Sequence, residues 1–356
     1  MTGAKRRALH PLAWWLWALA LGAAALRTSN PLLLGLLVAS AWFVVAARRS
    51  EAPWARSFGS FLRLGGVIIF IRMVLQALFG TRLPGHELFR VPEAVLPDWA
   101  AGVSVGGPVT AEAMAAAFRD GLQLAALLAC VGAANSLASP YRLLRSMPAV
   151  LYELGVVVTV ALSFAPQAVI SAQRVRDARR LRGRPHRGLA GLRGLAIPVL
   201  EGALEHSLQL AASMDSRGYG RRGEAAPRRR LVANAMTLVG ALAVCAGAYG
   251  LLDASAPRLL GLPALLAGGA LLGASLVLAG STSVRTRYRP DPWRLPEWAT
   301  LGAGVATLAG LVVATRVGVH GVQPAYSPVA WPALPLLPAA ATLIAVVPAF
   351  VTPEPS

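Results

Sequence analysis

The chain has 356 residues, of which 56% are hydrophobic and only 14% are charged. This balance excludes an ordinary soluble domain and predicts a polytopic all-α membrane protein. The formal net charge of +18 raises nucleic acid as a partner. However, the basic part of the chain has almost no aromatic residue on which bases could stack, so nucleic acid is not expected and part of the charge suits anionic lipid headgroups.

Nine apolar runs approach or exceed the length of about 20 residues that a helix needs to cross a bilayer. They lie near 12–27, 31–47, 61–80, 113–138, 149–170, 231–252, 259–280, 298–316 and 335–351. The first run follows a basic start and in this respect is similar to a signal peptide. Because a second run begins directly after Asn30-Pro31, we interpret the first run as a retained anchor.

The placement of arginine predicts the orientation of these runs in the cell membrane. Residues 171–230 hold fourteen arginines against five acidic residues, and 281–297 is also basic. Residues 81–112 are acidic on balance, and 317–334 contain no lysine, arginine or acidic residue. Because basic loops stay in the cytoplasm, the two basic segments are expected there and the other two segments outside.

This orientation leaves a conflict in the number of crossings. With the amino terminus inside, four crossings return the chain to the cytoplasm at Ser139. A fifth crossing through 149–170 would place the arginine-rich block outside, against the charge rule. Either one of the first five runs does not cross fully, or two of them form a shallow hairpin, and both alternatives stay open at this point.

Residues 171–230 are predicted to form two surface helices, the second of which is expected to open at Pro198. Both helices are expected to end on an arginine-glycine pair, Arg182-Gly183 and Arg217-Gly218. Glycine permits the left-handed turn that ends a helix, and arginine presents a planar fork that binds carboxylates. Leucines at 200, 204 and 208 give the second helix an apolar stripe that suits either a lipid surface or a protein partner.

Several motifs resemble those of the transmembrane T component of energy-coupling factor (ECF) transporters, the membrane subunit that links two ABC-type ATPases to a substrate-capturing membrane subunit. The resemblance covers roughly 8–250. It rests on the two arginine-glycine pairs at this separation and, more weakly, on His10-Pro11, Asn30-Pro31, Gly106-Gly107-Pro108-Val109-Thr110-Ala111-Glu112 and Ser163-Phe164-Ala165-Pro166. In this family each pair is typically Ala-Arg-Gly at the end of a coupling helix, and its arginine inserts into a groove of one ATPase.

The resemblance implies which residues dock the ATPases. Carried over, they are Leu181-Arg182-Gly183 and Ser216-Arg217-Gly218. Both triplets depart from the family pattern at the alanine position, where leucine is bulkier and serine is nearly the same size. The implied function is that of a coupling subunit for vitamin or transition-metal uptake, with ATP hydrolysed by the partner ATPases.

The domain organisation follows from these assignments. Residues 8–170 are expected to form N-terminal transmembrane helices, 171–230 the cytoplasmic coupling region and 231–252 a family-like transmembrane helix. Residues 253–356 fall outside the resemblance. Of their three apolar runs, 259–280 and 298–316 are dense in glycine and alanine suited to close helix packing, so we expect additional transmembrane helices forming an accessory bundle outside the transport path.

Charged residues within apolar runs are candidates for an intramembrane role. These are Arg72, Asp120 and Glu153. Because an ionised group is costly in lipid, Arg72 is expected to have a partner. One interpretation is a structural ion pair with Asp120 or Glu153, and the other is contact with the substrate-capturing subunit.

No catalytic site, metal site or cofactor is predicted. The five histidines lack metal-ligand spacing, and Cys130 and Cys245 each lie alone in an apolar run. The chain has no Walker-type glycine loop and no serine-elbow motif, so ATP hydrolysis is not expected on it. The alternative functions are an autonomous secondary transporter, for which no inverted repeat is visible, and a lipid-binding membrane scaffold.

Overall fold

The computed structural model describes residues 9–50, 57–79, 84–94, 105–146, 152–183, 188–218, 227–253, 257–280, 292–324 and 331–353. Seven of the described helices are long and apolar enough to cross a membrane. Among the described residues a single two-stranded sheet accompanies the helices, and the predicted all-α polytopic membrane fold is confirmed. The chain divides into two compact units, Met1–Leu143 with Asp291–Ser356, and Leu144–Pro290.

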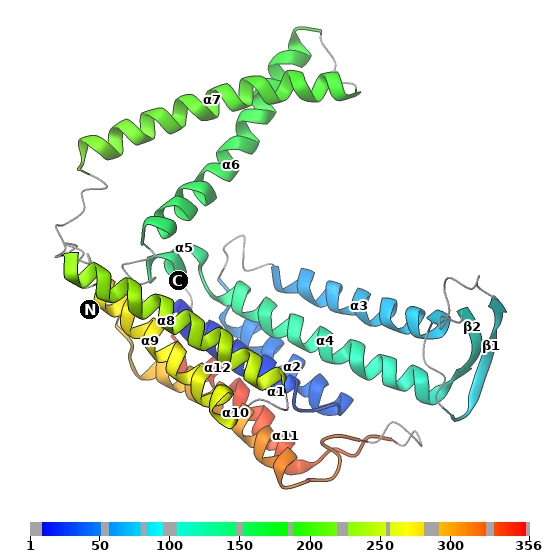
Figure 1. Ribbon diagram of the computed structural model, residues 1–356. Coiled ribbons are helices and arrows are strands. Elements are labelled where there is room, and N and C mark those ends of the chain that lie inside the picture. Colours follow the sequence, from blue (N-terminus) through cyan, green and yellow to red (C-terminus); the bar gives the residue numbers. More distant parts are fainter. Residues whose placement is uncertain are drawn as a thin grey trace, which may run out of the picture. The chain divides into compact units, whose positions relative to one another are not determined.

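The first unit combines helices from both ends of the chain (Figure 1). Its elements are α1 (Pro11–Ala25), α2 (Pro31–Arg48), α3 (Ser57–Phe79), β1 (Glu87–Ala94), β2 (Val105–Thr110), α4 (Ala111–Leu137), α10 (Leu295–Arg316), α11 (Leu336–Leu343), η5 (Ile344–Val346) and α12 (Pro348–Val351). The short α5 (Pro140–Arg145) lies at the boundary between the two units.

The first two helices begin at the His10-Pro11 and Asn30-Pro31 pairs. His10 Nδ1 accepts a hydrogen bond from the backbone N–H of Leu12 at 3.2 Å, and Asn30 Oδ1 accepts one from Leu32 at 2.9 Å. Each proline occupies the first helical turn, where its missing N–H has no helical partner to lose. These two pairs are therefore local start signals for helices.

A β-hairpin connects α3 to α4. Strands β1 and β2 pair antiparallel, and Gly106 and Gly107 on β2 adopt φ values of +85° and +118°, which favour glycine. Thr110 Oγ1 caps α4 by accepting from Ala113 N, and Glu112 Oε2 accepts from the backbone N–H of His86 at 2.9 Å. The acidic segment between the two helices is thus tied to the first turn of α4.

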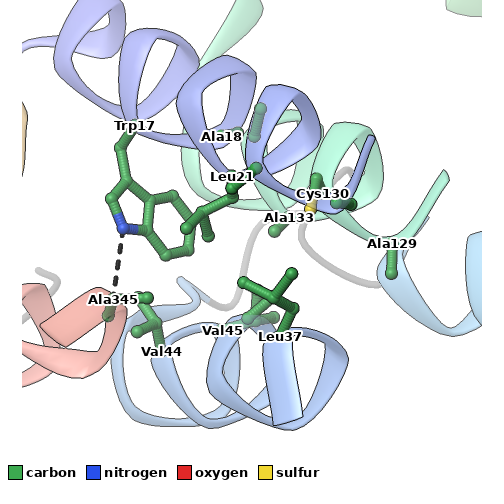
Figure 2. Packing of buried hydrophobic residues seen from close by; sticks show 14 of the residues in the cluster. Trp17, Ala18, Leu21, Leu37, Val44, Val45, Ala129, Cys130, Ala133 and Ala345 are labelled. Carbon is green, nitrogen blue, oxygen red and sulfur yellow. Dashed lines mark hydrogen bonds between the residues drawn. The ribbon is translucent and has the colours of Figure 1, made fainter. Parts of the chain in front are cut away.

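The core of the first unit lies between α1, α2 and α4 and includes the end of the chain (Figure 2). Trp17 and Leu21 of α1 are fully buried, and the Trp17 indole N–H donates to the carbonyl of Ala345 at 3.2 Å. The facing side of α4 carries small residues, among them Ala129 and Ala133, which are also fully buried. Small side chains let helix backbones approach closely, so packing here is tight.

The C-terminal helices share this core. Leu311 of α10 is fully buried, Ala345 and Ala349 belong to the same cluster, and Gly304 of α10 lies against the backbone of Trp17. Helix α9 (Leu262–Gly280), in contrast, packs with α8 (Pro227–Leu252) in the second unit. The helices of 253–356 therefore divide between the two units, because α10 to α12 pack against α1 and α2. Their accessory role outside the transport path stays a prediction.

The second unit contains α6 (Tyr152–Leu181), α7 (Gly188–Ser216), α8 (Pro227–Leu252), η4 (Arg258–Leu260) and α9. Helices α8 and α9 form an antiparallel hairpin (Figure 1). Gly240 lies against Leu272 and Gly247 against Leu265, while Thr237 Oγ1 and Ser275 Oγ are hydrogen bonded at 3.1 Å. Glycine at these positions allows the two backbones to lie in contact.

Helices α6 and α7 are longer than predicted. Residues 152–170 of the apolar run and the basic segment after it form one continuous helix of 30 residues. Helix α7 begins at Gly188, so the prediction that it opens at Pro198 is wrong. A proline inside a helix removes one backbone hydrogen bond and bends the helix without having to end it, and Pro166 is tolerated inside α6 in the same way.

Candidate docking helices

Helix α6 ends in a left-handed turn at the first predicted docking triplet. Gly183 has a φ of +68°, and its N–H donates to the carbonyl of Arg180 at 3.0 Å. The N–H of Arg182 donates to the carbonyl of Ala178 at 3.2 Å. These bonds satisfy carbonyls that the end of a helix leaves free, and they fix the direction in which Arg182 leaves the helix.

Helix α7 ends in the same way at the second triplet. Gly218 has a φ of +72°, and its N–H donates to the backbone carbonyl of Asp215 at 2.8 Å. Arg217 N donates to Met214 at 3.2 Å, and the Ser216 hydroxyl donates to the carbonyl of Ser213 at 2.9 Å. Both arginines therefore stand at the negative end of a helix, one residue before a glycine that ends it.

The side chains of both triplets are available to a partner. Leu181 is 90% exposed, and Arg182, Ser216 and Arg217 are exposed as well. Within the part of the chain that the structure describes, neither guanidinium has a hydrogen-bond or ion-pair partner. An arginine fork without an internal partner is free to bind a carboxylate bidentately.

Helices α6 and α7 cross as an antiparallel pair (Figure 1). The rings of Phe164 and His206 stack with centroids 6.1 Å apart and an interplanar angle of 24°. Nearer the connection, the guanidinium of Arg179 packs against Gly194.

This crossing sets the separation of the two turns. The first lies close to the start of α7 and the second at its far end. Twenty-two residues separate Gly194 from Ser216, so the two arginines are on the order of 30 Å apart at 1.5 Å per residue.

The apolar stripe of α7 is uncovered in the second unit. Leu200, Leu204 and Leu208 are 61%, 65% and 71% exposed. They share one face of the helix at four-residue spacing. The stripe is thus open to lipid or to another protein, as both interpretations of the sequence require.

The intramembrane candidates are Arg72, Asp120 and Glu153. Arg72 of α3 and Asp120 of α4 form an ion pair with 3.0 Å between Nη2 and Oδ2. Glu153 lies in the first turn of α6, and its side chain is outside the described residues. The pair joins two antiparallel helices that also approach each other closely at glycines, such as Gly65 against Ala125.

Sequence reasoning missed the polar ties between the two ends of the chain. Asn30, which is fully buried, donates from Nδ2 to the carbonyl of Ala333 at 2.8 Å, and Arg48 Nε donates to the carbonyl of Ala349 at 2.8 Å. Glu297, also buried, accepts from the N–H of His10 at 3.4 Å. The His10-Pro11 and Asn30-Pro31 pairs were visible beforehand, but neither indicated a contact with the other end of the chain.

Similarity to known proteins identifies the family. The model of the CbiQ cobalt transport protein family matches residues 4–227. The chain belongs to the CbiQ family. This is the family of ECF transporter T components, so the chain is a membrane component of a transport system and not itself an enzyme. A search among curated proteins finds no match to this CbiQ-family chain.

The CbiQ match includes both arginine-glycine turns and ends at Pro227, the first residue of α8. Helices α9 to α12 and nearly all of α8 therefore lie outside it. Among the described residues, no group of three or more histidine, cysteine, aspartate or glutamate side chains is placed to hold a metal ion. The candidate site of this CbiQ-family protein consists of the two exposed helix ends that carry Arg182 and Arg217.

Proposed function

We propose that this CbiQ-family protein is the transmembrane coupling subunit of an ECF-type importer. The observation that carries the proposal is the pair of exposed left-handed turns, each with an arginine at the end of a long helix. Two ABC-type ATPase subunits bind these turns, one at Leu181-Arg182-Gly183 and one at Ser216-Arg217-Gly218. A substrate-capturing membrane subunit receives the resulting motion.

The chemistry of the turns suits this role. A guanidinium at the end of a rigid helix binds a carboxylate in a partner's groove through two parallel hydrogen bonds, which fixes direction as well as distance. When the partner moves, the helix end must follow it. The separation of roughly 30 Å between the turns suits two sockets on separate subunits, because α7 is rigid enough to keep them apart. Closure of the ATPases then changes the angle or position of α6 and α7.

The directions of the helices in the first unit support a cytoplasmic location for both turns. Helix α4 runs antiparallel to α1. Arg142, in α5 just beyond the end of α4, donates to the carbonyl of Leu9 at the start of α1 at 3.0 Å. Gln123, nearer the start of α4, donates to the carbonyl of Ala25 at the end of α1 at 3.1 Å. Helix α10 runs parallel to α1, because its start meets His10 through Glu297. The chain therefore leaves this unit after α4 and returns to it before α10 on the side where α1 begins.

The second unit must then contain an even number of crossings. Helices α8 and α9 form an antiparallel hairpin and account for two. Helix α7 is not among the helices apolar enough to span, whereas α6 is, by its length and composition. If α6 crossed alone, the chain would re-enter the first unit on the wrong side. We therefore propose that α6 does not cross and that α6 and α7 lie on the side of the amino terminus, which the charge rule makes cytoplasmic.

The leucine stripe and the family description refine the proposal. The stripe formed by Leu200, Leu204 and Leu208 lets α7 lie on the inner face of the bilayer, where arginines gain contact with anionic headgroups. The family description favours a transition-metal cation such as cobalt over a vitamin as the cargo. The cargo is captured by the partner membrane subunit.

The proposal is tested by charge reversal at both turns. The variant Arg182→Glu with Arg217→Glu is expected to lose both ATPase subunits in a detergent pull-down, because truncating or reversing a desolvated ion pair costs about 2–5 kcal/mol. The matched control is Arg174→Glu with Arg176→Glu, which makes the same charge change at exposed positions within α6. Retention of both ATPases by the turn variant, or equal loss in the control, would refute docking at the turns.

A further inference from the structure

An ion pair stands on a mainly apolar flank of α3 and α4, with Gln76 one helical turn after Arg72. Arg72 lies seven residues before the end of α3, and Asp120 lies nine residues after the start of α4, so both are about 10 Å or more inside their helices. Their side chains are 49% and 41% exposed, with Nη2 and Oδ2 3.0 Å apart. The pair therefore lies well inside two helices that are expected to cross the membrane, and about half of each side chain is exposed on the surface of the unit.

The surroundings of the pair are those of a membrane surface. Ile71 and Leu75 of α3 and Leu124 of α4 are each 47–48% exposed beside it. The two helices do not need the pair to stay together. They contact each other through small residues along their length, with Gly121 against Ile69 and Gly132 against Phe61. A role confined to joining α3 and α4 leaves the exposed half of each charged side chain unexplained.

Lipid tails are a poor cover for this flank. Ionised side chains within a membrane almost always face a bundle interior, a cavity or another polar group, because hydrocarbon cannot replace their hydration. Hydrocarbon suits Ile71, Leu75 and Leu124 but not the pair. We infer that a transmembrane helix of the substrate-capturing subunit covers the flank around Arg72 and Asp120. This inference rests on the proposed function, because that function supplies the second membrane subunit.

The chemistry of the pair specifies the covering helix. A guanidinium has five N–H donors, and within the described residues Asp120 is the only partner of Arg72. The pair therefore has more donors than acceptors left over. The helix that covers it is expected to present a hydrogen-bond acceptor, such as a hydroxyl, amide or carboxylate oxygen, within an apolar face that packs on Ile71 and Leu124.

The test removes the pair and keeps the apolar flank. The variant Arg72→Leu with Asp120→Leu is expected to retain both ATPases while the co-purifying membrane subunit falls about tenfold, as for the loss of an interhelical polar contact. The control is Arg63→Leu, which removes another exposed arginine from the opposite side of α3. Its membrane subunit should stay at the wild-type level. An unchanged amount in the double variant would overturn the inference.

Photocrosslinking decides the case if the double variant does not fold. In the otherwise unchanged chain, p-benzoylphenylalanine at Leu124 should link to the membrane subunit that co-purifies with the complex, whereas the same probe at Phe70, on the other side of α3, should not. Adducts to lipid alone at Leu124 would overturn the inference. Absence of ATPases from the wild-type complex would instead refute the proposed function, and the Leu124 crosslink would still report what covers the flank.

Discussion

The replacement of Asn30 by alanine tests whether the two ends of the chain form one folded unit. Asn30 is fully buried, its Oδ1 caps α2, and its Nδ2 donates to the carbonyls of Gly321 and Ala333 at 2.5 and 2.8 Å. Loss of the cap costs about 1 kcal/mol. Each of the two part-buried hydrogen bonds contributes about 0.5–1.5 kcal/mol, so the total loss should reach about 2–4 kcal/mol.

The assay is thermal unfolding of the detergent-solubilised chain, with the folded fraction after each heating step measured by size-exclusion chromatography. A loss of about 2–4 kcal/mol should lower the melting temperature by about 4–16 °C, at roughly 2–4 °C per kcal/mol for a unit of this size. Asn135→Ala is the matched control, because it removes one half-buried hydrogen bond, to Ser57 at 3.2 Å, and should cost about 1 kcal/mol.

A second substitution separates the cap from the ties to the C-terminal segment. Asn30→Asp keeps an oxygen that caps α2 but turns an acceptor toward the two carbonyls, so it should destabilise at least as much as alanine. Near-normal stability of Asn30→Asp, or a shift in Asn30→Ala no larger than in Asn135→Ala, would refute the reasoning. The loss in Asn30→Ala would then belong to the cap alone.

Three further predictions follow from the helix ends and the topology. Gly183→Ala should destabilise the end of α6 by about 1–2 kcal/mol because its φ is positive, whereas Gly202→Ala inside α7, with open space around it, should stabilise by about 0.5–1 kcal/mol; melting temperatures of the two variants should shift in opposite directions. Cysteines placed at Ser171 and Leu88, after both native cysteines are replaced, should react with an impermeant thiol reagent from the inside and the outside respectively; labelling of both from one side contradicts the parity argument. Truncation after Arg285 should expose the core face of α1 and cause aggregation, and a monodisperse truncated chain would show that α10 to α12 are dispensable.

The amino-acid sequence by itself determined the class of the protein and the local geometry of its helix ends. Apolar runs of spanning length can be recognised in the sequence because the backbone polar groups of a segment within a bilayer must be hydrogen bonded inside its own helix. The ends at Gly183 and Gly218 were legible for a similar reason, since a left-handed turn after an arginine depends on neighbouring residues only. The same locality made the starts at Pro11 and Pro31 readable.

Only the tertiary structure decided which helices belong together. Small faces such as that around Gly304 pack equally well on many partners, so nothing in the sequence indicated that α10 would lie against Trp17 rather than against α9. Helix directions also depend on contacts between distant residues, such as Leu9 with Arg142. These directions require an even number of crossings between α4 and α10, a condition that the sequence alone did not supply. Composition determines whether a helix can enter a membrane, whereas contacts between distant residues determine which helices it packs against.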